Sequence, residues 1–232
     1  MPQRFAIYYA PAATDPLWLK AVEWHGRDPF SGEVFETAVG GVTREALFAR
    51  SISARRYGFH ATIKAPMSLA EGRMQAELEA ALAGFAAAHA PVAIGALKLV
   101  LLEGFLALVP AVQSAELLAF AAEVVEGFEA FRAATSPAER ERRLKGSHYS
   151  ERQIELIDTL GYPYVLEQFQ LHMTLTDRLP ESEREAYSRA AAAHFGALAT
   201  RETMLDRLVL FHEPEAGAPF VRLGDYVLSG KA

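Results

Sequence analysis

The sequence contains no cysteine. The chain can therefore form neither a disulfide nor a thiolate nucleophile or ligand, a composition that suits a reducing compartment. It also lacks an excess of positive charge, since its formal net charge at pH 7 is −6 over 232 residues. Proteins that coat long nucleic acid gain most of their affinity by neutralising phosphates, so long nucleic acid is not the expected partner.

Long hydrophobic runs are missing as well. The longest uncharged apolar stretches fall well short of the roughly 20 residues that a membrane span needs, although 51% of the residues are hydrophobic. The sequence opens with Met1-Pro2-Gln3-Arg4-Phe5 and passes directly into an alternating strand pattern. This opening lacks the apolar core of a signal peptide. We therefore expect no membrane partner and a cytoplasmic location.

No linker rich in proline, glycine and serine divides the chain, and its length allows a substantial core. We predict a single domain over residues 1–232. Helical and strand patterns follow one another without regular crossovers, which indicates an α+β fold with antiparallel strands. Strands are predicted near residues 4–10, 57–64, 98–103, 105–109, 168–176, 207–212 and 220–223, and helices near 16–25, 43–50, 71–89, 114–132, 137–145, 150–160 and 181–195.

Two short segments, 112 positions apart, carry nearly the same pattern: Phe59-His60-Ala61-Thr62-Ile63 and Leu171-His172-Met173-Thr174-Leu175. Successive side chains of a β-strand point to opposite faces. Each segment would therefore bury its three apolar residues and present an imidazole beside a hydroxyl on the other face. Two imidazoles and two hydroxyls could then converge on one phosphate.

Similar elements follow both segments. A helical pattern and a pair of strand patterns come after the first motif and again after the second, so the chain resembles a diverged duplication with units near 57–110 and 168–228. One histidine in each unit would place two imidazoles across a pseudo-two-fold axis. A third His-x-Ser sequence, His148-Tyr149-Ser150, lies outside any strand pattern and is interpreted as a chance occurrence.

The paired motifs fit the hydrolysis of a cyclic phosphodiester. The attacking water must lose a proton and the leaving alkoxide must gain one, and an imidazole that titrates near 6.5 can do either. Thr62 and Thr174 could donate hydrogen bonds to the non-bridging oxygens, together with Lys64 on the same face. No His-x-His or His-Glu-x-x-His sequence lies near either motif. We therefore predict no metal site and no cofactor, with Asp177 alone a weak ligand candidate.

A few local cations could bind a small phosphorylated substrate despite the acidic whole. The candidates are Arg55, Arg56 and Lys64 around the first motif and Arg140, Arg142, Arg143 and Lys145 in the middle of the chain. We expect Lys64 and at least one of these arginines to line the cleft. The second group alternates with Glu139 and Glu141, so a solvated helix face remains an alternative interpretation.

Paired His-x-Thr strands in a duplicated α+β chain resemble the 2H phosphoesterase superfamily, which includes 2′,5′-RNA ligase-like proteins and cyclic nucleotide phosphodiesterases. The stretches 57–66, 161–165 and 172–176 resemble more narrowly its DUF1045 branch, associated with phosphonate metabolism. The resemblance implies two pseudo-symmetric lobes, each a small antiparallel sheet with helices outside, and an active cleft between them. It also implies metal-independent hydrolysis.

From this resemblance His60, Thr62, His172 and Thr174 are expected to be catalytic, with His172 as base and His60 as acid. Lys64, Tyr57 and Arg143 are expected to bind substrate. The favoured substrate is a small cyclic phosphate, such as a phosphoribosyl cyclic phosphate.

The alternatives are a nucleoside or RNA 2′,3′-cyclic phosphodiesterase, an RNA ligase-like enzyme, and a non-catalytic phosphate- or nucleotide-binding module. A purely structural alternative has two half-buried strand histidines bonded to neighbouring threonines. The sequence does not specify the oligomeric state.

Overall fold

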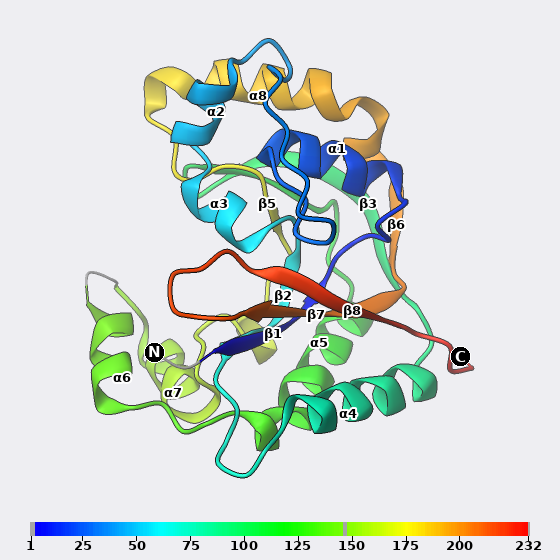
Figure 1. Ribbon diagram of the computed structural model, residues 1–232, viewed down its shortest axis with the longest axis vertical. Helices are drawn as coiled ribbons and strands as arrows, with labels where there is room; N and C mark the ends of the chain where they lie inside the picture. The colour runs from blue at the N-terminus through cyan, green and yellow to red at the C-terminus, as the bar shows by residue number, and fades with distance from the viewer. Residues whose placement is uncertain (1–2, 146–147, 232) are drawn as a thin grey trace.

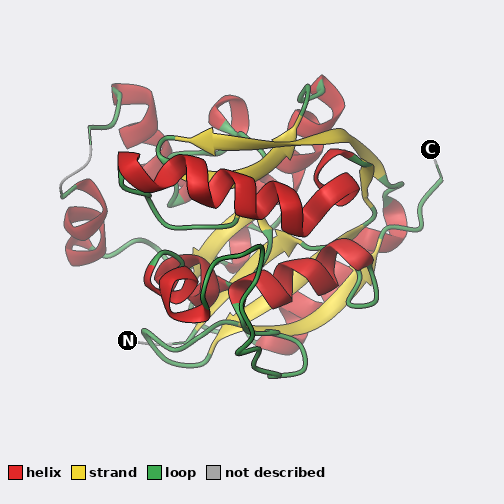
Figure 2. Cartoon of the chain, turned by 90° about the horizontal axis from the view of Figure 1, so that it is seen from above, coloured by secondary structure: helices red, strands yellow, loops and turns green. Residues whose placement is uncertain are grey.

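The computed structural model describes residues 3–145 and 148–231, so Met1 and Pro2 of the opening segment lie outside the described residues. Antiparallel strands form one curled sheet, and helices lie around its outside (Figures 1 and 2). The predicted α+β class is confirmed. The strands are β1 Arg4–Tyr9, β2 Ala61–Met67, β3 Val92–Leu102, β4 Phe105–Pro110, β5 Met173–Thr174, β6 Glu202–Leu205, β7 Arg207–Glu213 and β8 Val221–Val227. The α-helices are α1 Pro16–His25, α2 Arg44–Ala49, α3 Ile52–Tyr57, α4 Gln75–Ala88, α5 Ala115–Gly127, α6 Pro137–Leu144, α7 Glu151–Leu160 and α8 Glu181–Phe195.

The strand order places the two motif strands at the centre of the sheet. It runs β6-β3-β4-β5-β2-β1-β7-β8, so β5 and β2 are neighbours with three strands on either side. The β3–β4 hairpin follows the first motif in sequence but pairs with β5. The β7–β8 hairpin follows the second motif but lies on the β2 side, next to β1. The two predicted repeats are therefore interleaved, and each half of the sheet contains strands from both.

Helices cover both ends of the sheet. In Figure 1, α1, α2 and α8 lie together at the top, and α4 and α5 lie below the strands. Short-range signals set their ends: the Asp15 side chain caps α1 by accepting a hydrogen bond from the amide of Leu17, and Gly26 ends it in the left-handed conformation. Ser114 caps α5 in the same way. One continuous cluster of buried apolar side chains joins helices and strands of both halves.

Both motif strands are shorter than the alternating patterns predict. Residue 57 ends α3, and Gly58 has φ +81°, so β2 begins only at Ala61. In the second motif, a 3₁₀ turn over Leu166–Gln168 occupies part of the predicted strand, and only Met173–Thr174 joins the ladder. Local backbone geometry thus overrides the period-2 pattern outside the His-x-Thr core.

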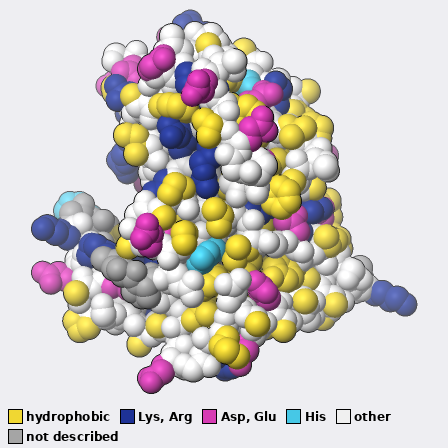
Figure 3. All heavy atoms as spheres, viewed as in Figure 1, with side chains coloured by type: hydrophobic (Ala, Val, Ile, Leu, Met, Phe, Trp, Pro, Cys, Tyr) yellow, Lys and Arg dark blue, Asp and Glu magenta, His cyan; other side chains and the backbone are white. Residues whose placement is uncertain are grey.

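The surface mixes charges of both signs. Figure 3 shows dark blue and magenta side chains interspersed with hydrophobic ones on the face toward the viewer. Within residues 3–145 and 148–231, none of the helices combines the length and the apolar character that crossing a bilayer requires.

Candidate functional site

The two His-x-Thr motifs lie side by side, in opposite directions, at the centre of the sheet. Ala61 pairs with Met173 in the antiparallel ladder between β2 and β5. This register puts each histidine opposite the threonine of the other motif. In such a ladder the Cβ atoms of directly opposite residues lie about 4.5–5.5 Å apart, and diagonal neighbours lie about 7–8 Å apart. The two imidazoles, as a diagonal pair, can therefore both contact a phosphate-sized group.

Burial alternates in the same way along both motifs. The apolar positions are buried and the His and Thr positions are half-buried on the opposite face. The buried set is Phe59, Ala61, Ile63, Leu171, Met173 and Leu175. The apolar residues thus anchor both strands in the core, while the polar pairs stay accessible to a ligand.

Both motif histidines are held in the same way by the backbone. The Nδ1 atom of His60 lies 2.8 Å from the carbonyl oxygen of Gly58, and Nδ1 of His172 lies 2.8 Å from that of Gln170. A carbonyl can only accept a hydrogen bond, so Nδ1 is the protonated nitrogen in each neutral ring. Each Nε2 is then left with its lone pair. That of His60 lies 3.2 Å from the hydroxyl of Thr62.

A pocket of about 280 Å³ opens over the motifs. Its lining combines imidazole, hydroxyl and phenol groups from β1, β2, β5 and α3. The lining residues are Tyr8, Ser53, Ala54, Tyr57, Gly58, His60, Thr62, Ala65, Pro66, Tyr162, Thr174 and Asp177. Three of the four predicted catalytic residues therefore line one pocket, and the fourth, His172, directly precedes β5 and is not among the lining residues.

The two histidines differ in how they are covered. Tyr8 lies on β1 opposite Thr62. Its ring stacks on the imidazole of His60 with 3.7 Å between centroids. The corresponding position beside Thr174 is Ala107, which carries no ring, and His172 instead meets the tilted ring of Phe105 at 6.0 Å between centroids. Burial lowers the pKa of His60 to about 3, so this imidazole is neutral at physiological pH.

A second histidine is buried close behind the first. His25 is 1% exposed and packs edge-on against Phe59, with 6.2 Å between ring centroids. Burial lowers the pKa of His25 to about 4. In the unfolded chain both imidazoles would titrate near 6.5.

These lowered pKa values predict that the free energy of unfolding falls in acid. Between pH 6.5 and about 3 for His60, and about 4 for His25, the unfolded chain binds protons that the folded chain excludes. The stabilisation is therefore complete above 6.5 and lost as the pH falls. Urea unfolding at pH 7 and at pH 5 measures how far the free energy of unfolding falls between the two. We expect this fall to be smaller in His60→Asn than in the parent, by up to about 2 kcal/mol. An equal loss in both proteins would contradict the assignment.

Asp177 positions α3 at the rim of the pocket. Its carboxylate accepts hydrogen bonds from the amides of Ser53 and Ala54, at 3.1 and 3.2 Å. A carboxylate at these amides satisfies donors that the helix leaves unpaired. Asp177 is thus bound to the backbone.

The sequence offered Asp177 as a weak metal-ligand candidate. Across residues 3–145 and 148–231, no three His, Asp or Glu side chains are grouped as metal ligands.

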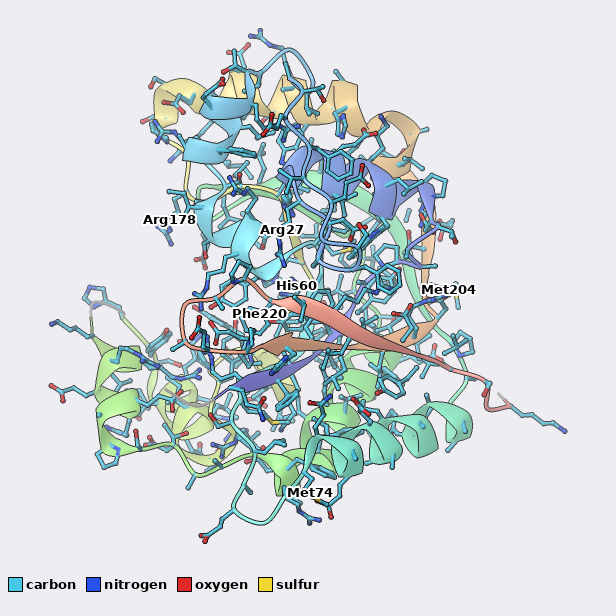
Figure 4. All side chains as sticks on the ribbon, in the orientation of Figure 1. Arg27, His60, Met74, Arg178, Met204 and Phe220 are labelled. Atoms are coloured by element: carbon cyan, nitrogen blue, oxygen red, sulfur yellow. The ribbon has the colours of Figure 1, made fainter. Side chains whose placement is uncertain are left out.

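Tyr57, at the end of α3, forms one wall of the pocket. Its ring stacks on Phe220 with 4.9 Å between centroids and lies 6.3 Å from the ring of His60. Figure 4 shows His60 and Phe220 close together below α3. The predicted substrate-binding position of Tyr57 therefore lies beside the imidazole.

Gly58 is required by the backbone between Tyr57 and His60. Its φ and ψ are +81° and 174°, a region that only glycine adopts without strain. An added Cβ would lie 2.9 Å from Cγ of Pro29. Gly58→Ala is therefore expected to lower the free energy of unfolding by about 1–3 kcal/mol. Thermal or urea unfolding measures this loss. Gly72→Ala is the control, because Gly72 also has a positive φ of +78° but has no atom within 4 Å of an added Cβ. Its loss reports backbone strain alone, without the clash.

The candidate cations do not line the pocket over the motifs. Lys64 is 3% exposed, and its ammonium donates to Val125 O at 2.8 Å and to the Glu129 carboxylate at 2.7 Å. Arg56 binds Glu213, and the guanidinium of Arg55 lies 3.8 Å from the centroid of the Phe48 ring. The expectation of a cation beside the histidines is thus wrong for the pocket itself, because these charges are paired elsewhere.

Positive charge instead lines an adjoining cavity of about 530 Å³. Lys64, Arg142 and Arg143 all face this cavity, and Ala65, Pro66 and Tyr162 line both spaces. Arg140 is paired with Asp158 at the surface, as the solvated-face interpretation expects. The predicted substrate-binding residues are therefore divided between two adjacent cavities that share three lining residues.

Two aromatic residues and two backbone groups of the site are not predicted by the sequence pattern. Tyr8 has the pattern of an ordinary strand residue, and Tyr162 lies within the stretch 161–165 without a separate signal. The carbonyls of Gly58 and Gln170 leave no trace in the sequence, since any residue supplies a carbonyl. Only the repeated spacing, two residues before each histidine, could have indicated them.

Comparisons with known proteins place the chain in a family. A family described as "Protein of unknown function (DUF1045)" matches residues 62–221. Two curated relatives carry the name "Ribose 1,5-bisphosphate phosphokinase PhnN". The one from Janthinobacterium sp. (strain Marseille) is 35% identical over 98% of this chain and 51% of its own length. The one from Laribacter hongkongensis (strain HLHK9) is 36% identical over 94% and 50%. The chain spans about half the length of these relatives.

Solved structures with some likeness were found too. One is titled "Crystal structure of phosphoesterase", with 14% identity, a TM-score of 0.42 and 99% of each chain covered. Another is titled "Crystal structure of E.coli LigT complexed with 3'-AMP", with 15% identity, a TM-score of 0.40 and the same coverage.

Proposed function

We propose that this chain, which belongs to the DUF1045 family, hydrolyses a small cyclic phosphodiester with its two motif histidines as general base and general acid. The observation that carries the proposal is the antiparallel pairing of the motifs about Ala61 and Met173. In this register two imidazoles, each bound to a backbone carbonyl through Nδ1, and two hydroxyls would face one ligand. General acid–base catalysis requires such groups within hydrogen-bond reach of the protons they move.

In the proposed reaction, water attacks phosphorus and the bond from phosphorus to one ring oxygen breaks. One imidazole takes a proton from the water, and the other, protonated, gives one to the leaving alkoxide, so the product is a phosphomonoester. Thr62 and Thr174 donate hydrogen bonds to the non-bridging oxygens, where charge develops. In the free protein the Thr62 hydroxyl lies 3.2 Å from Nε2 of His60, so it must turn away from this nitrogen to donate to the phosphate.

The environment of His60 favours it as the base. Tyr8 covers this imidazole and burial lowers its pKa to about 3, so it is unprotonated when the substrate arrives. His172, whose ring is tilted against Phe105 with 6.0 Å between centroids and has no stacked partner at Ala107, then acts as the acid. This is the reverse of the roles that the family resemblance implies. The pH dependence of kcat/KM separates the two, because weakening the stacking in Tyr8→Leu should shift the acidic limb toward higher pH only if His60 is the base.

The substrate class is proposed from the relatives. Their printed name concerns a ribose bisphosphate, so we propose a cyclic phosphate of a phosphorylated ribose, in the metabolism of phosphonates. A screen of ribose 1,2-cyclic phosphates and nucleoside 2′,3′-cyclic phosphates by phosphorus NMR tests this directly. We expect conversion to a phosphomonoester, unchanged by EDTA, with the phosphorylated ribose as the best substrate.

The other outcomes identify the alternatives. A preference for nucleoside 2′,3′-cyclic phosphates would point to an RNA-directed enzyme. A rise in melting temperature with ligand, without product, would identify a binding module. Loss of turnover with EDTA, while the His60→Ala and His172→Ala variants stay active, would refute the two-histidine mechanism.

A further inference from the structure

The larger cavity beside the motif pocket has no role in the reaction just described. It is bounded by β2, the segment 132–136, α6 and Tyr162, and it shares Ala65, Pro66 and Tyr162 with the motif pocket. Its volume of about 530 Å³ falls in the range of small-molecule sites. The two cavities are thus close enough for one elongated ligand to be considered for both, with Tyr162 at their shared boundary.

The cavity carries a surplus of positive charge. Its lining contains Arg4, Lys64, Arg132, Arg142 and Arg143, against one carboxylate, Glu139. Each carboxylate bound to these cations also binds a second cation, which in one case, Arg56, lies outside the lining. Glu129 binds both Lys64 and Arg132, Glu139 binds both Arg142 and Arg143, and Glu213 binds both Arg4 and Arg56.

A carboxylate shared between two cations offsets only one of their two positive charges, as Glu129 does between Lys64 and Arg132 and Glu213 between Arg4 and Arg56. These two groups lie at this cavity in a chain whose net charge is −6. Low-dielectric walls strengthen the field of such charges inside a cleft. The positive charge at the cavity therefore favours the binding of an anion here, although the net charge of the whole chain is negative.

Arg143 has unused hydrogen-bonding capacity at this place. Its contact with Glu139 is a single, long one of 3.3 Å. Its Nε is buried and has no hydrogen-bond partner within the described part of the chain. A buried donor left unpaired costs free energy, which an anionic ligand would recover.

We propose that this cavity binds a second phosphate group of the substrate, remote from the cyclic phosphodiester, with Arg143 as its principal ligand. The proposal rests on the proposed function for the location of the first phosphate, and it makes the substrate class a sugar carrying both a cyclic phosphate and a phosphomonoester. The sugar then passes between the two spaces beside Tyr162, which lines both.

The test compares Arg143→Gln with Arg140→Gln, a matched variant on the same helix whose guanidinium binds Asp158 outside the cavity. The substrates are ribose 1,2-cyclic phosphate with and without a 5-phosphate. Loss of a charge-assisted hydrogen bond should lower kcat/KM of Arg143→Gln by about 10- to 100-fold with the 5-phosphate, mainly through KM. Without the 5-phosphate, Arg143→Gln, Arg140→Gln and the parent should be alike.

A binding measurement keeps the proposal testable if neither compound is hydrolysed. Calorimetry with ribose 5-phosphate, and with ribose as the control, should show binding of the phosphorylated sugar alone, weakened at least tenfold in Arg143→Gln and unchanged in Arg140→Gln. The proposal is overturned if the parent binds both sugars equally or neither. It is also overturned if Arg143→Gln binds like the parent. Binding without turnover would refute the proposed function and leave the anion site standing.

Discussion

Replacing His60 or His172 with alanine is expected to lower kcat/KM for the cyclic phosphate by about 10² to 10⁴, the usual size of general acid–base catalysis. Each variant removes one of the two proposed proton-transfer groups and leaves the hydroxyls of both threonines in place. The double variant should lose much less than the product of the two single losses, because residues that act as a unit are not additive. Steady-state rates on the substrate found by phosphorus NMR provide the measurement.

Two controls separate catalysis from folding. His89→Ala removes an imidazole that is bonded to Glu123 at the end of α4 and lines neither cavity, so its rate should equal that of the parent. The melting temperatures of the two motif variants show whether they are folded. A folded His60→Ala or His172→Ala protein with the rate of the parent would rule out that residue as a proton-transfer group.

Thr62→Ala and Thr174→Ala are expected to lower the rate by about 10- to 10³-fold, which is less than the histidine variants. Each removes one hydroxyl donor to the phosphate oxygens while both imidazoles remain. Thr→Ser at either position keeps the hydroxyl and should restore most of the rate. Thr200→Ala, on the 3₁₀ turn Gly196–Thr200 away from the site, serves as a matched control. If serine and alanine gave the same loss at position 62 or 174, the threonine would act through packing and not through its hydroxyl.

The core of the site could be predicted from the sequence because its determinants are local. Alternation of apolar and polar residues over five positions fixes which side chains share a face, and it does so in both motifs. The duplicated arrangement then indicates that the two faces meet. The antiparallel strands and the DUF1045 membership are confirmed. The catalytic roles stay predictions.

The positions of the charges could not be predicted, because they depend on distant partners. Lys64 has the right spacing to join His60 and Thr62, yet its ammonium is drawn to Glu129, 65 residues further along the chain. Tyr8 reaches His60 only because β1 pairs with β2 in the register that places Tyr8 opposite Thr62. No short-range pattern encodes such a pairing. For the same reason, the sequence does not predict that the β3–β4 hairpin pairs with β5 or that the β7–β8 hairpin lies on the β2 side.

The two-residue strand β5 has a mechanical consequence. The sheet is continuous from β6 to β8 only through Met173 and Thr174, so the seam that joins the two halves is also the line along which the motif histidines meet. Under the proposed function, a ligand bound by both imidazoles would bridge this seam and link the two four-stranded halves reversibly. Twisting one half against the other would separate the two imidazoles, so the backbone hydrogen bonds of the seam would affect both the stiffness of the sheet and the rate of the proposed reaction.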